Sequence, residues 1–223
     1  MSPVSGLADR AALYARLNAG MAELGLAASA DVCEKLLDYL ELLERWNAAY
    51  NLTAVRGASD MIDRHILDSL AIAKYVHGDT LVDIGSGAGL PGIPLAILDS
   101  SLACTLVDSN GKKARFLREA LRTLALDNVR VENIRVEEFR GEFSTITARA
   151  FASIAEIVAM SGHLLARDGV LLAMKGLLKK EEILALPPQF VIDDTRVLAV
   201  PGVGAARSLI VIRRATMTQH HAA

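Results

Sequence analysis

The chain has 223 residues, of which 52% are hydrophobic and 4% aromatic, and its net charge at pH 7 is −2. It is long and apolar enough for a buried core, which Leu, Ala, Ile and Val must fill because aromatic side chains are scarce. The charge does not indicate a broadly basic nucleic-acid binder, so any RNA contact must come from local clusters of Lys and Arg. The two cysteines and five histidines show no metal-type spacing, so no zinc site is indicated, and the low cysteine count is typical of a reducing compartment.

The N-terminal segment Met1–Arg10 carries Asp9 and has no apolar stretch typical of a signal peptide. No later apolar run is long enough to span a bilayer, so we expect a cytoplasmic protein. Two groups of apolar residues then recur at helical spacing: Leu13, Leu17, Met21 and Leu24, followed by Val32, Leu36, Leu40 and Leu43. They predict an N-terminal cap of two helices over residues 1–50, and a third helix is expected from an N-cap at Ser59 to Val76.

A short apolar strand, Thr80–Ile84, then runs straight into the glycine-rich segment 85–92 and a helix. Glycines let a backbone approach a ligand closely, and the helix start after Pro91 offers N–H groups to an anionic ligand group. A dinucleotide loop reads G-x-G-x-x-G, whereas this loop reads G-x-G-x-G and follows Asp83 by two residues. A carboxylate repels a pyrophosphate but attracts a cationic amino acid group. The loop therefore favours S-adenosylmethionine, which carries a sulfonium and an α-ammonium.

A second acid supports a nucleoside cofactor. The next expected strand, 103–107, ends at Asp108, which lies 23 residues beyond Gly85. Nucleoside-binding α/β folds place an acid about 20 residues past the loop, where it accepts hydrogen bonds from the ribose hydroxyls. A strand, turn and helix with incidental glycines would explain neither acid.

Apolar runs and helical patterns alternate through the rest of the chain. Further strands are expected at 129–133, 145–148 and 169–174, and helices at 93–98, 112–124 and 152–165. This alternation predicts a parallel sheet, and the β-rich runs 190–200 and 208–214 predict a terminal hairpin. The expected fold is thus the α/β, Rossmann-like class I methyltransferase fold, with a mostly parallel seven-stranded sheet ending in an antiparallel hairpin. We expect a single methyltransferase domain, with the helical cap at 1–50, the core at 51–214 and a tail at 215–223.

One pattern of short blocks covers most of the chain, from Trp46 to Arg213. The blocks are Trp46-Asn47 with Asn51-Leu52-Thr53, Arg64 to Ser69, Asp83 to Pro94, Asp108-Ser109 with Gly111-Lys112-Lys113 and Phe116-Leu117, Arg149-Ala150 with Ala152, and Lys175-Gly176. In these blocks the sequence resembles the GidB/RsmG family of bacterial methyltransferases, which modify N7 of a guanine in small-subunit ribosomal RNA. The resemblance implies 16S ribosomal RNA, in the small subunit or an assembly intermediate, as the partner of a monomeric enzyme.

The resemblance also implies which residues contact the cofactor. It points to Gly85, Leu90, Asp108 and Arg149, and it places Val136-Glu137 at the adenine. With the loop itself, the expected cofactor-binding set is Asp83, Gly85, Gly87, Gly89, Leu90, Asp108, Val136, Glu137 and Arg149. Asn110 departs from the leucine expected at its position.

Arg64 and His65 precede the glycine strand on a helix whose apolar face is Ile62, Ile66 and Leu70. The pattern turns both residues away from that face, and a solvated surface is the simplest explanation. The family pattern makes substrate contact an equal alternative. For Asp68, a structural ion pair with Arg64 across one helical turn is an equal alternative, and Asp68 is left out of the site.

Arg149 and Lys175 both follow apolar strands, where the loops of an α/β sheet converge on the ligand crevice. The substrate-positioning candidates are therefore Arg64, His65 and Lys175, and no catalytic residue is assigned. The cations between Lys112 and Arg122 are expected to form an ordinary polar helix face. Trp46 and Tyr50 are expected to pack together rather than stack on a base.

Guanine N7 carries a lone pair and no proton, so its methylation needs no general base, and the lack of an obvious catalytic dyad is expected. Three alternatives remain. The first is a methyltransferase acting on another RNA position, a protein or a small molecule, and the second is a non-catalytic cofactor-binding assembly factor. The third is a dehydrogenase, which Asp83 and the terminal hairpin disfavour. No metal and no membrane contact are expected.

Overall fold

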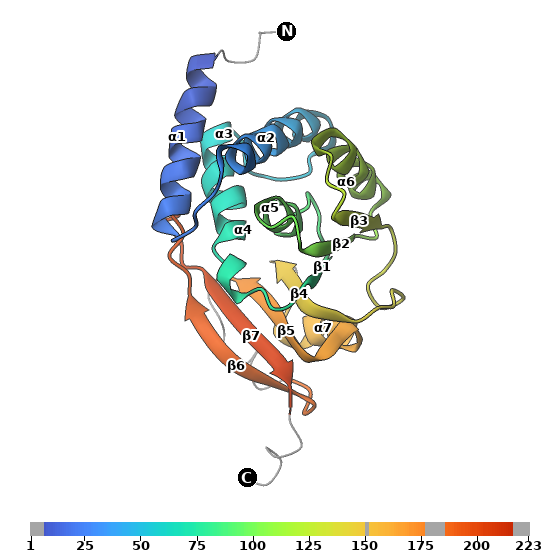
Figure 1. Cartoon of the computed structure of the whole chain (residues 1–223). Coiled ribbons are helices and arrows are strands. Elements are labelled where there is room, and N and C mark those ends of the chain that lie inside the picture. Colours follow the sequence, from blue (N-terminus) through green and yellow to red (C-terminus); the bar gives the residue numbers. More distant parts are fainter. Residues whose placement is uncertain (1–6, 150–151, 177–185, 216–223) are drawn as a thin grey trace.

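The structure is a computed structural model that describes residues 7–149, 152–176 and 186–215. A seven-stranded sheet of order β3-β2-β1-β4-β5-β7-β6 lies at its centre (Figure 1). Its strands are β1 (Thr80–Ile84), β2 (Ala103–Val107), β3 (Val129–Glu132), β4 (Phe143–Arg149), β5 (Leu165–Lys175), β6 (Phe190–Val197) and β7 (Ser208–Arg214). Residues 1–6, Ala150 of the family pattern and the expected tail beyond residue 215 lie outside the described part of the chain.

The strand directions confirm the predicted topology. Strand β1 runs parallel to β2 and β4, and the pairs β2–β3 and β4–β5 are also parallel. Strand β7 is antiparallel to both β5 and β6, which forms the expected terminal hairpin. All parallel strands therefore end at one edge of the sheet, and their loops meet there.

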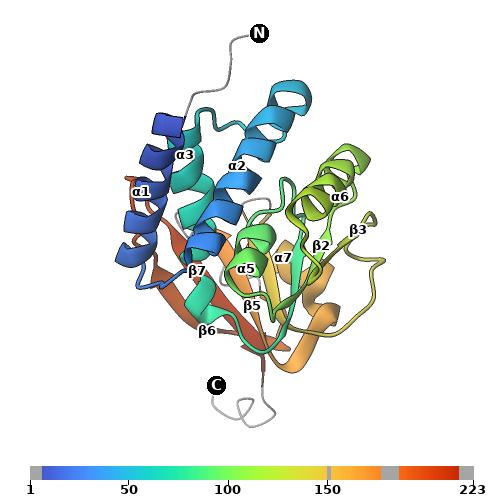
Figure 2. The same cartoon turned by 45° about the horizontal axis from the view of Figure 1, so that its top comes forward.

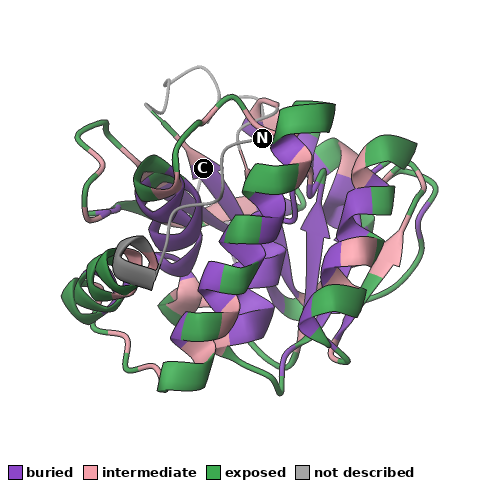
Figure 3. Ribbon diagram, turned by 90° about the horizontal axis from the view of Figure 1, so that it is seen from above, coloured by how far each residue is buried: buried purple, intermediate pink, exposed green. Residues whose placement is uncertain are grey.

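Helices cover both faces of the sheet. One face carries α1 (Leu7–Glu23), α2 (Ala30–Tyr50), α3 (Ala58–Met61), α4 (Asp68–Leu70), α5 (Gly92–Leu98) and α6 (Gly111–Leu124), while α7 (Ile154–Ser161) packs on the other (Figures 1 and 2). Each long helix turns its buried side to the sheet and its exposed side outward (Figure 3). No helix in the described ranges is long and apolar enough to cross a membrane.

The core has two halves because side chains alternate across the strands. In β5, Leu172 and Met174 join the cluster under the N-terminal helices, whereas Leu171 and Ala173 face the cluster beneath α7. Successive residues of a strand point to opposite faces of a sheet. Buried apolar runs such as this one are typical of parallel strands covered on both sides. Cys33 and Cys104 are free and buried, as expected.

The last parallel unit differs from the predicted boundaries. The helix expected over 152–165 ends at Ser161, and a short 3-10 helix, η3 (Gly162–Leu164), follows it. Strand β5 then begins at Leu165. A capping box between Ser153 and Glu156 fixes the start of α7, and this signal was missed in the sequence.

The third expected helix is also irregular. Its N-cap is Gly57 rather than Ser59. Gly57 has a φ of 82° and makes no side-chain cap hydrogen bond. A π-helical turn, η1 (Ile62–Leu67), separates α3 from α4, and a 3-10 turn, η2 (Ala73–Tyr75), follows. Every residue of η1 except Arg64 is buried. The expectation that His65 lies on a polar face with Arg64 is therefore wrong.

Candidate functional site

Two regions lie at the edge where the parallel strands end. The first is the glycine loop, residues 85–91, between β1 and α5. The second is a cavity of about 250 Å³, which we call the basic cavity. Its neutral lining is Val55, His65, Met174 and Gly176, and its charged lining is Arg64, Asp68, Arg149, Lys175 and Arg207.

The glycines of the loop serve two different purposes. Gly85, Gly87 and Gly89 have φ values of 61°, 60° and 88°, which residues with a Cβ rarely adopt. A Cβ on Gly89 would lie 2.4 Å from Ile93 Cδ1, so packing also requires this glycine. A Cβ on Gly87 would meet nothing closer than 3.8 Å, so the backbone there borders open space that a ligand can enter.

The side chain of Asp83 is buried beneath the loop. Its Oδ2 accepts a hydrogen bond from the Gly92 N–H at 3.2 Å, and its Oδ1 accepts one from the Thr147 hydroxyl at 2.9 Å. Burial raises the pKa of this carboxyl to about 6. Asp83 thus ties the end of the loop to β4. Its direct contact with a ligand stays a prediction.

Asp108 lies where three segments converge. Its Oδ2 accepts a hydrogen bond from the Gly87 N–H at 2.8 Å, its Oδ1 accepts one from the Asn110 N–H at 2.8 Å, and Lys113 Nζ is 3.8 Å from Oδ2. Asn133, after β3, donates to the Asp108 backbone carbonyl at 2.8 Å. A carboxylate has about four acceptor positions, so Asp108 retains capacity for further donors such as ribose hydroxyls.

The surroundings of Asp108 fit a nucleoside. Asn110 caps α6 by accepting hydrogen bonds from the backbone N–H groups of Lys112 and Lys113, which explains an asparagine at this position. The segment after β3 carries Val136, which is half-buried, and Glu137, which is exposed. The open backbone at Gly87 and the acceptors of Asp108 thus form a cradle that suits an adenosine group.

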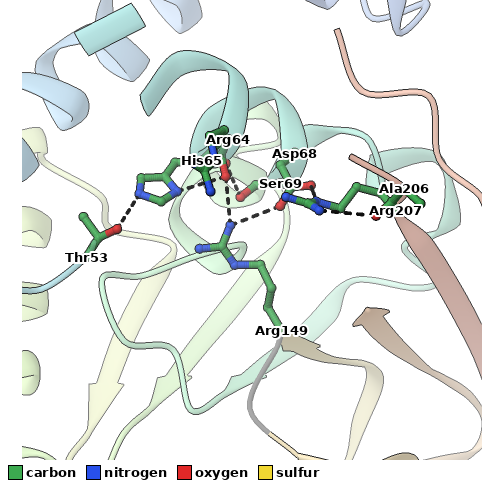
Figure 4. A network of polar contacts seen from close by, with 8 residues as sticks. All are labelled: Thr53, Arg64, His65, Asp68, Ser69, Arg149, Ala206 and Arg207. Atoms are coloured by element: carbon green, nitrogen blue, oxygen red, sulfur yellow. Dashed lines mark hydrogen bonds and ion pairs between the residues drawn. The ribbon is translucent and has the colours of Figure 1, made fainter. Parts of the chain in front are cut away.

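The basic cavity is organised by one buried carboxylate, Asp68, whose side chain is 5% exposed. Arg149 Nη1 lies 3.2 Å from Asp68 Oδ2, and Arg207 Nε lies 3.0 Å from Asp68 Oδ1 (Figure 4). Arg149 Nη1 also donates to the Arg64 carbonyl at 3.3 Å. The alternative pairing of Asp68 with Arg64 is not seen among the described residues, because Arg149 of β4 and Arg207, the residue before β7, contact its two oxygens.

His65 joins this network as a neutral group. Its Nδ1 lies 2.9 Å from the Arg64 carbonyl, which only accepts, so the proton is assigned to Nδ1. Its Nε2 then accepts a hydrogen bond from the Thr53 hydroxyl at 2.8 Å. Burial, and next the charge of Arg149, lower the pKa of His65 to about 4. With both ring nitrogens engaged, His65 holds the cavity wall rather than facing a ligand.

The wall held by His65 is the segment before α3. The Thr53 N–H donates a hydrogen bond to Asn47 Oδ1 at 2.9 Å, and the Thr53 hydroxyl accepts one from the Val55 N–H at 3.1 Å. Val55 lines the cavity. The family block at Asn47 to Thr53 therefore does not line the cavity itself. It contributes to the site by fixing the backbone that carries Val55.

The structure brings the substrate-positioning candidates Arg64, His65 and Lys175 together around one cavity, and it places Arg149, which was expected to bind the cofactor, in the same lining. Lys175 Nζ donates to the Ala152 carbonyl at 2.7 Å, and Arg64 is exposed at the rim. The cofactor candidates Gly87 and Asp108 contact each other at the glycine loop instead. Arg149 belongs to the cavity by its contacts, although its charge also influences buried Asp83.

Two charged residues of the cavity were not assigned to the site from the sequence, Asp68 and Arg207. Arg207 belongs to no local motif. The only available signal was the hairpin register, which pairs Ser208 with Lys175 and so places Arg207 beside the end of β5. The Trp46 ring stacks on the Tyr50 ring with their centroids 5.0 Å apart, and the centroids of Trp46 and Phe116 are 5.7 Å apart. These contacts confirm the packing role expected for Trp46 and Tyr50.

Comparison with known proteins identifies relatives across most of the chain. A family model described as rRNA small subunit methyltransferase G matches residues 32–211. Ribosomal RNA small subunit methyltransferase G of Xanthomonas campestris pv. campestris (strain B100) is 51% identical over 187 residues, which are 83% of this chain and 88% of the relative. The protein of the same name from Chromohalobacter salexigens is 50% identical over 205 residues, 92% of this chain and 99% of that one.

Solved structures share the fold at much lower identity. TrmN from Thermus thermophilus has a TM-score of 0.54 at 20% identity, covering 76% of this chain and 53% of its own. TrmK from M. capricolum, solved in complex with S-adenosyl-homocysteine, has a TM-score of 0.54 at 16% identity, covering 66% of this chain and 67% of its own. These structures support the class I methyltransferase fold.

Proposed function

The chain belongs to the rRNA small subunit methyltransferase G family, and from this premise we propose that it transfers a methyl group to N7 of a guanine in 16S ribosomal RNA. The enzyme is an S-adenosylmethionine-dependent methyltransferase. The observation that carries the proposal is the pairing of two unlike regions at one edge of the sheet. The glycine loop rests on buried acids, while the basic cavity exposes arginine and lysine to a polyanion.

In this proposal the glycine loop binds the cofactor, which supplies an electrophilic methyl group when bound. Asp108 accepts hydrogen bonds from the ribose hydroxyls, and the backbone of Gly85, Gly87 and Gly89 lies against the ligand. Val136 and Glu137 border the adenine. The Asp83 carboxylate, which supports the loop, attracts the cationic end of the cofactor.

The basic cavity holds the RNA. Arg64 and Lys175 neutralise phosphates near the target guanosine, and His65 keeps the wall at Val55 in place. Guanine N7 has an available lone pair, so the protein aligns N7 with the methyl carbon and the sulfur rather than removing a proton. A purine methylated at N7 carries positive charge, so the site must tolerate this charge.

We further propose that the enzyme acts as a monomer in the cytoplasm, on the small subunit or an assembly intermediate. Sedimentation of the purified enzyme with and without small subunits tests this. A single slow species that joins the subunit peak is the expected result, whereas a stable dimer contradicts the monomer.

The direct test of the proposed function uses cofactor with a labelled methyl group and small subunits from a strain that lacks the enzyme. Label is expected in 16S ribosomal RNA, and mass spectrometry of nuclease digests is expected to find 7-methylguanosine. Subunits from a strain that carries the enzyme are the matched control and should accept almost no label, because their site is already modified. Label in a protein, a small molecule or another base contradicts the proposal. Cofactor binding without any transfer indicates a non-catalytic assembly factor.

A further inference from the structure

We propose that Asp68 is a positioning residue that fixes Arg149 and Arg207 as a pair of donors for the RNA. The inference rests on the proposed function, because it assigns a role within the same cavity. It differs from a purely structural ion pair in one respect: the arginines that Asp68 holds face the cavity that receives the substrate.

The geometry gives each arginine one oxygen of the carboxylate. Arg149 reaches Asp68 Oδ2 from the end of β4, and Arg207 reaches Oδ1 from the residue before β7 (Figure 4). The Asp68 side chain is 5% exposed, whereas those of Arg149 and Arg207 are 20% and 24% exposed. The anchor is therefore buried, and the two groups that it holds reach solvent.

The remaining donors are available to a ligand. A guanidinium has five N–H groups. Arg149 uses Nη1 for Asp68 and the Arg64 carbonyl, and Arg207 uses Nε for Asp68 and Nη1 for the Ala206 carbonyl. Among the described residues, nothing accepts a hydrogen bond from Nε or Nη2 of Arg149 or from Nη2 of Arg207. Two planar groups fixed in this way suit the two oxygens of a phosphodiester.

The charge of Asp68 matters as well as its position. The cavity contains four cationic side chains, those of Arg64, Arg149, Lys175 and Arg207, and the single carboxylate of Asp68. A purine that becomes positively charged during transfer is disfavoured by nearby unpaired cations. Asp68 offsets the positive charge of one guanidinium. The cavity therefore stays attractive to phosphate and becomes less repulsive to the methylated base.

The same helical segment supplies a matched control, Asp63. Its side chain is 6% exposed and pairs with Arg16 of α1, so it is also a buried acid bound to an arginine. Asp63 does not line the basic cavity. A loss caused only by breaking a buried ion pair is therefore expected in both variants, whereas a loss of substrate positioning is expected only at Asp68.

The experiment measures steady-state methyl transfer to undermethylated small subunits, together with cofactor affinity by calorimetry, for Asp68→Asn and Asp63→Asn. We expect Asp68→Asn to lower kcat/KM for the subunit by about 10- to 100-fold, with cofactor affinity within about threefold of wild type. Asp63→Asn is expected to change kcat/KM by less than about threefold. Asp68→Glu, which keeps the charge, is expected to recover part of the loss.

Arg207→Gln leaves Asp68 in place, so this variant keeps the proposal testable if Asp68→Asn folds poorly, and it should reproduce the loss of kcat/KM. Where Asp68→Asn folds, adding it to Arg207→Gln should lower kcat/KM much less than it does in the wild type, because the two residues act as one unit. The slope of log KM against log salt should also fall by about one in Arg207→Gln.

Equal effects of Asp68→Asn and Asp63→Asn, or additive losses in the double variant, overturn the inference. A loss of cofactor affinity as large as the loss of transfer also overturns it, since the arginines would then serve the cofactor. Failure of the wild-type enzyme to methylate small subunits refutes the proposed function instead, so the two failures are distinguishable.

Discussion

The glycine loop and the basic cavity lie at the same edge of the sheet, yet they are built in opposite ways. The loop is seven consecutive residues, 85–91, supported from below by the buried acids Asp83 and Asp108. The cavity gathers residues from position 55 to position 207 and presents four cationic side chains, two of which are held by one acid. A cationic cofactor and a polyanionic RNA need opposite electrostatic surroundings, and the fold provides them on neighbouring loops.

Glycine substitutions should separate the two regions most clearly. Gly89→Ala is expected to lower the free energy of unfolding by about 3 kcal/mol, because Gly89 has a φ of 88° and the added Cβ would lie 2.4 Å from Ile93 Cδ1. The matched change in the cavity is Gly176→Ala, whose Cβ would meet nothing within 4 Å. Its expected cost is below about 0.5 kcal/mol. Urea unfolding measures both, and equal costs would contradict the packing described for the loop.

The buried titratable groups of the two regions should give opposite pH dependences. His65, in the cavity, has its pKa lowered to about 4, so its contribution to stability is present above its unfolded pKa of 6.5 and is lost as pH falls through 4. The unfolding free energy of wild type minus that of His65→Gln should therefore fall by about 3 kcal/mol between pH 7 and pH 4. A difference that does not change with pH would show that His65 is not held neutral.

Asp83, beneath the loop, should behave in the opposite sense. Its pKa is raised to about 6 from 3.8, so its contribution is present below the unfolded pKa and is lost as pH rises through 6. The unfolding free energy of wild type minus that of Asp83→Asn should fall by about 2 kcal/mol as pH rises from 4 to 7. A difference that increases over this range would mean that the carboxylate is stabilised in its charged form.

Cofactor binding should stabilise the protein through the glycine loop. At a hundredfold excess over the dissociation constant, S-adenosylmethionine or its demethylated product is expected to add about 2.7 kcal/mol. For a chain of this size that corresponds to a rise in Tm of several degrees, at about 2–4 °C per kcal/mol. Thermal unfolding with NAD is the control and should show no rise. A rise with NAD alone would reinstate the dehydrogenase alternative.

The difference in construction also explains what could be predicted from the sequence. Strands β1 and β2 have the predicted bounds, and the loop between β1 and α5 lies where expected, because a strand, its glycines and its following helix are local signals. The seven-stranded topology followed from the alternation of elements and from the hairpin. Asp108 was found because its distance from the loop along the chain is typical of the fold.

The cavity could be predicted only in part. Arg64, His65 and Lys175 were identified as substrate-positioning candidates, whereas Arg149 was expected at the cofactor and Asp68 was left out of the site. Its true partners, Arg149 and Arg207, are brought to it by β4 and by the hairpin, and no local pattern records that contact. The π turn that buries His65 is likewise set by packing against the rest of the fold rather than by helical spacing.

The most direct test of this division of labour measures cofactor affinity and methyl transfer for Asp108→Asn and Lys175→Ala in parallel. Asp108→Asn should weaken cofactor binding by about 1.5 to 3 kcal/mol, measured by calorimetry, because the ribose hydroxyls lose a charged acceptor. Its transfer to undermethylated 16S ribosomal RNA should recover when the cofactor concentration is raised. Lys175→Ala should bind cofactor like the wild type and still transfer poorly at saturating cofactor. The account is contradicted if Lys175→Ala loses cofactor affinity while Asp108→Asn keeps it. It is also contradicted if both variants lose cofactor affinity and methyl transfer to the same extent.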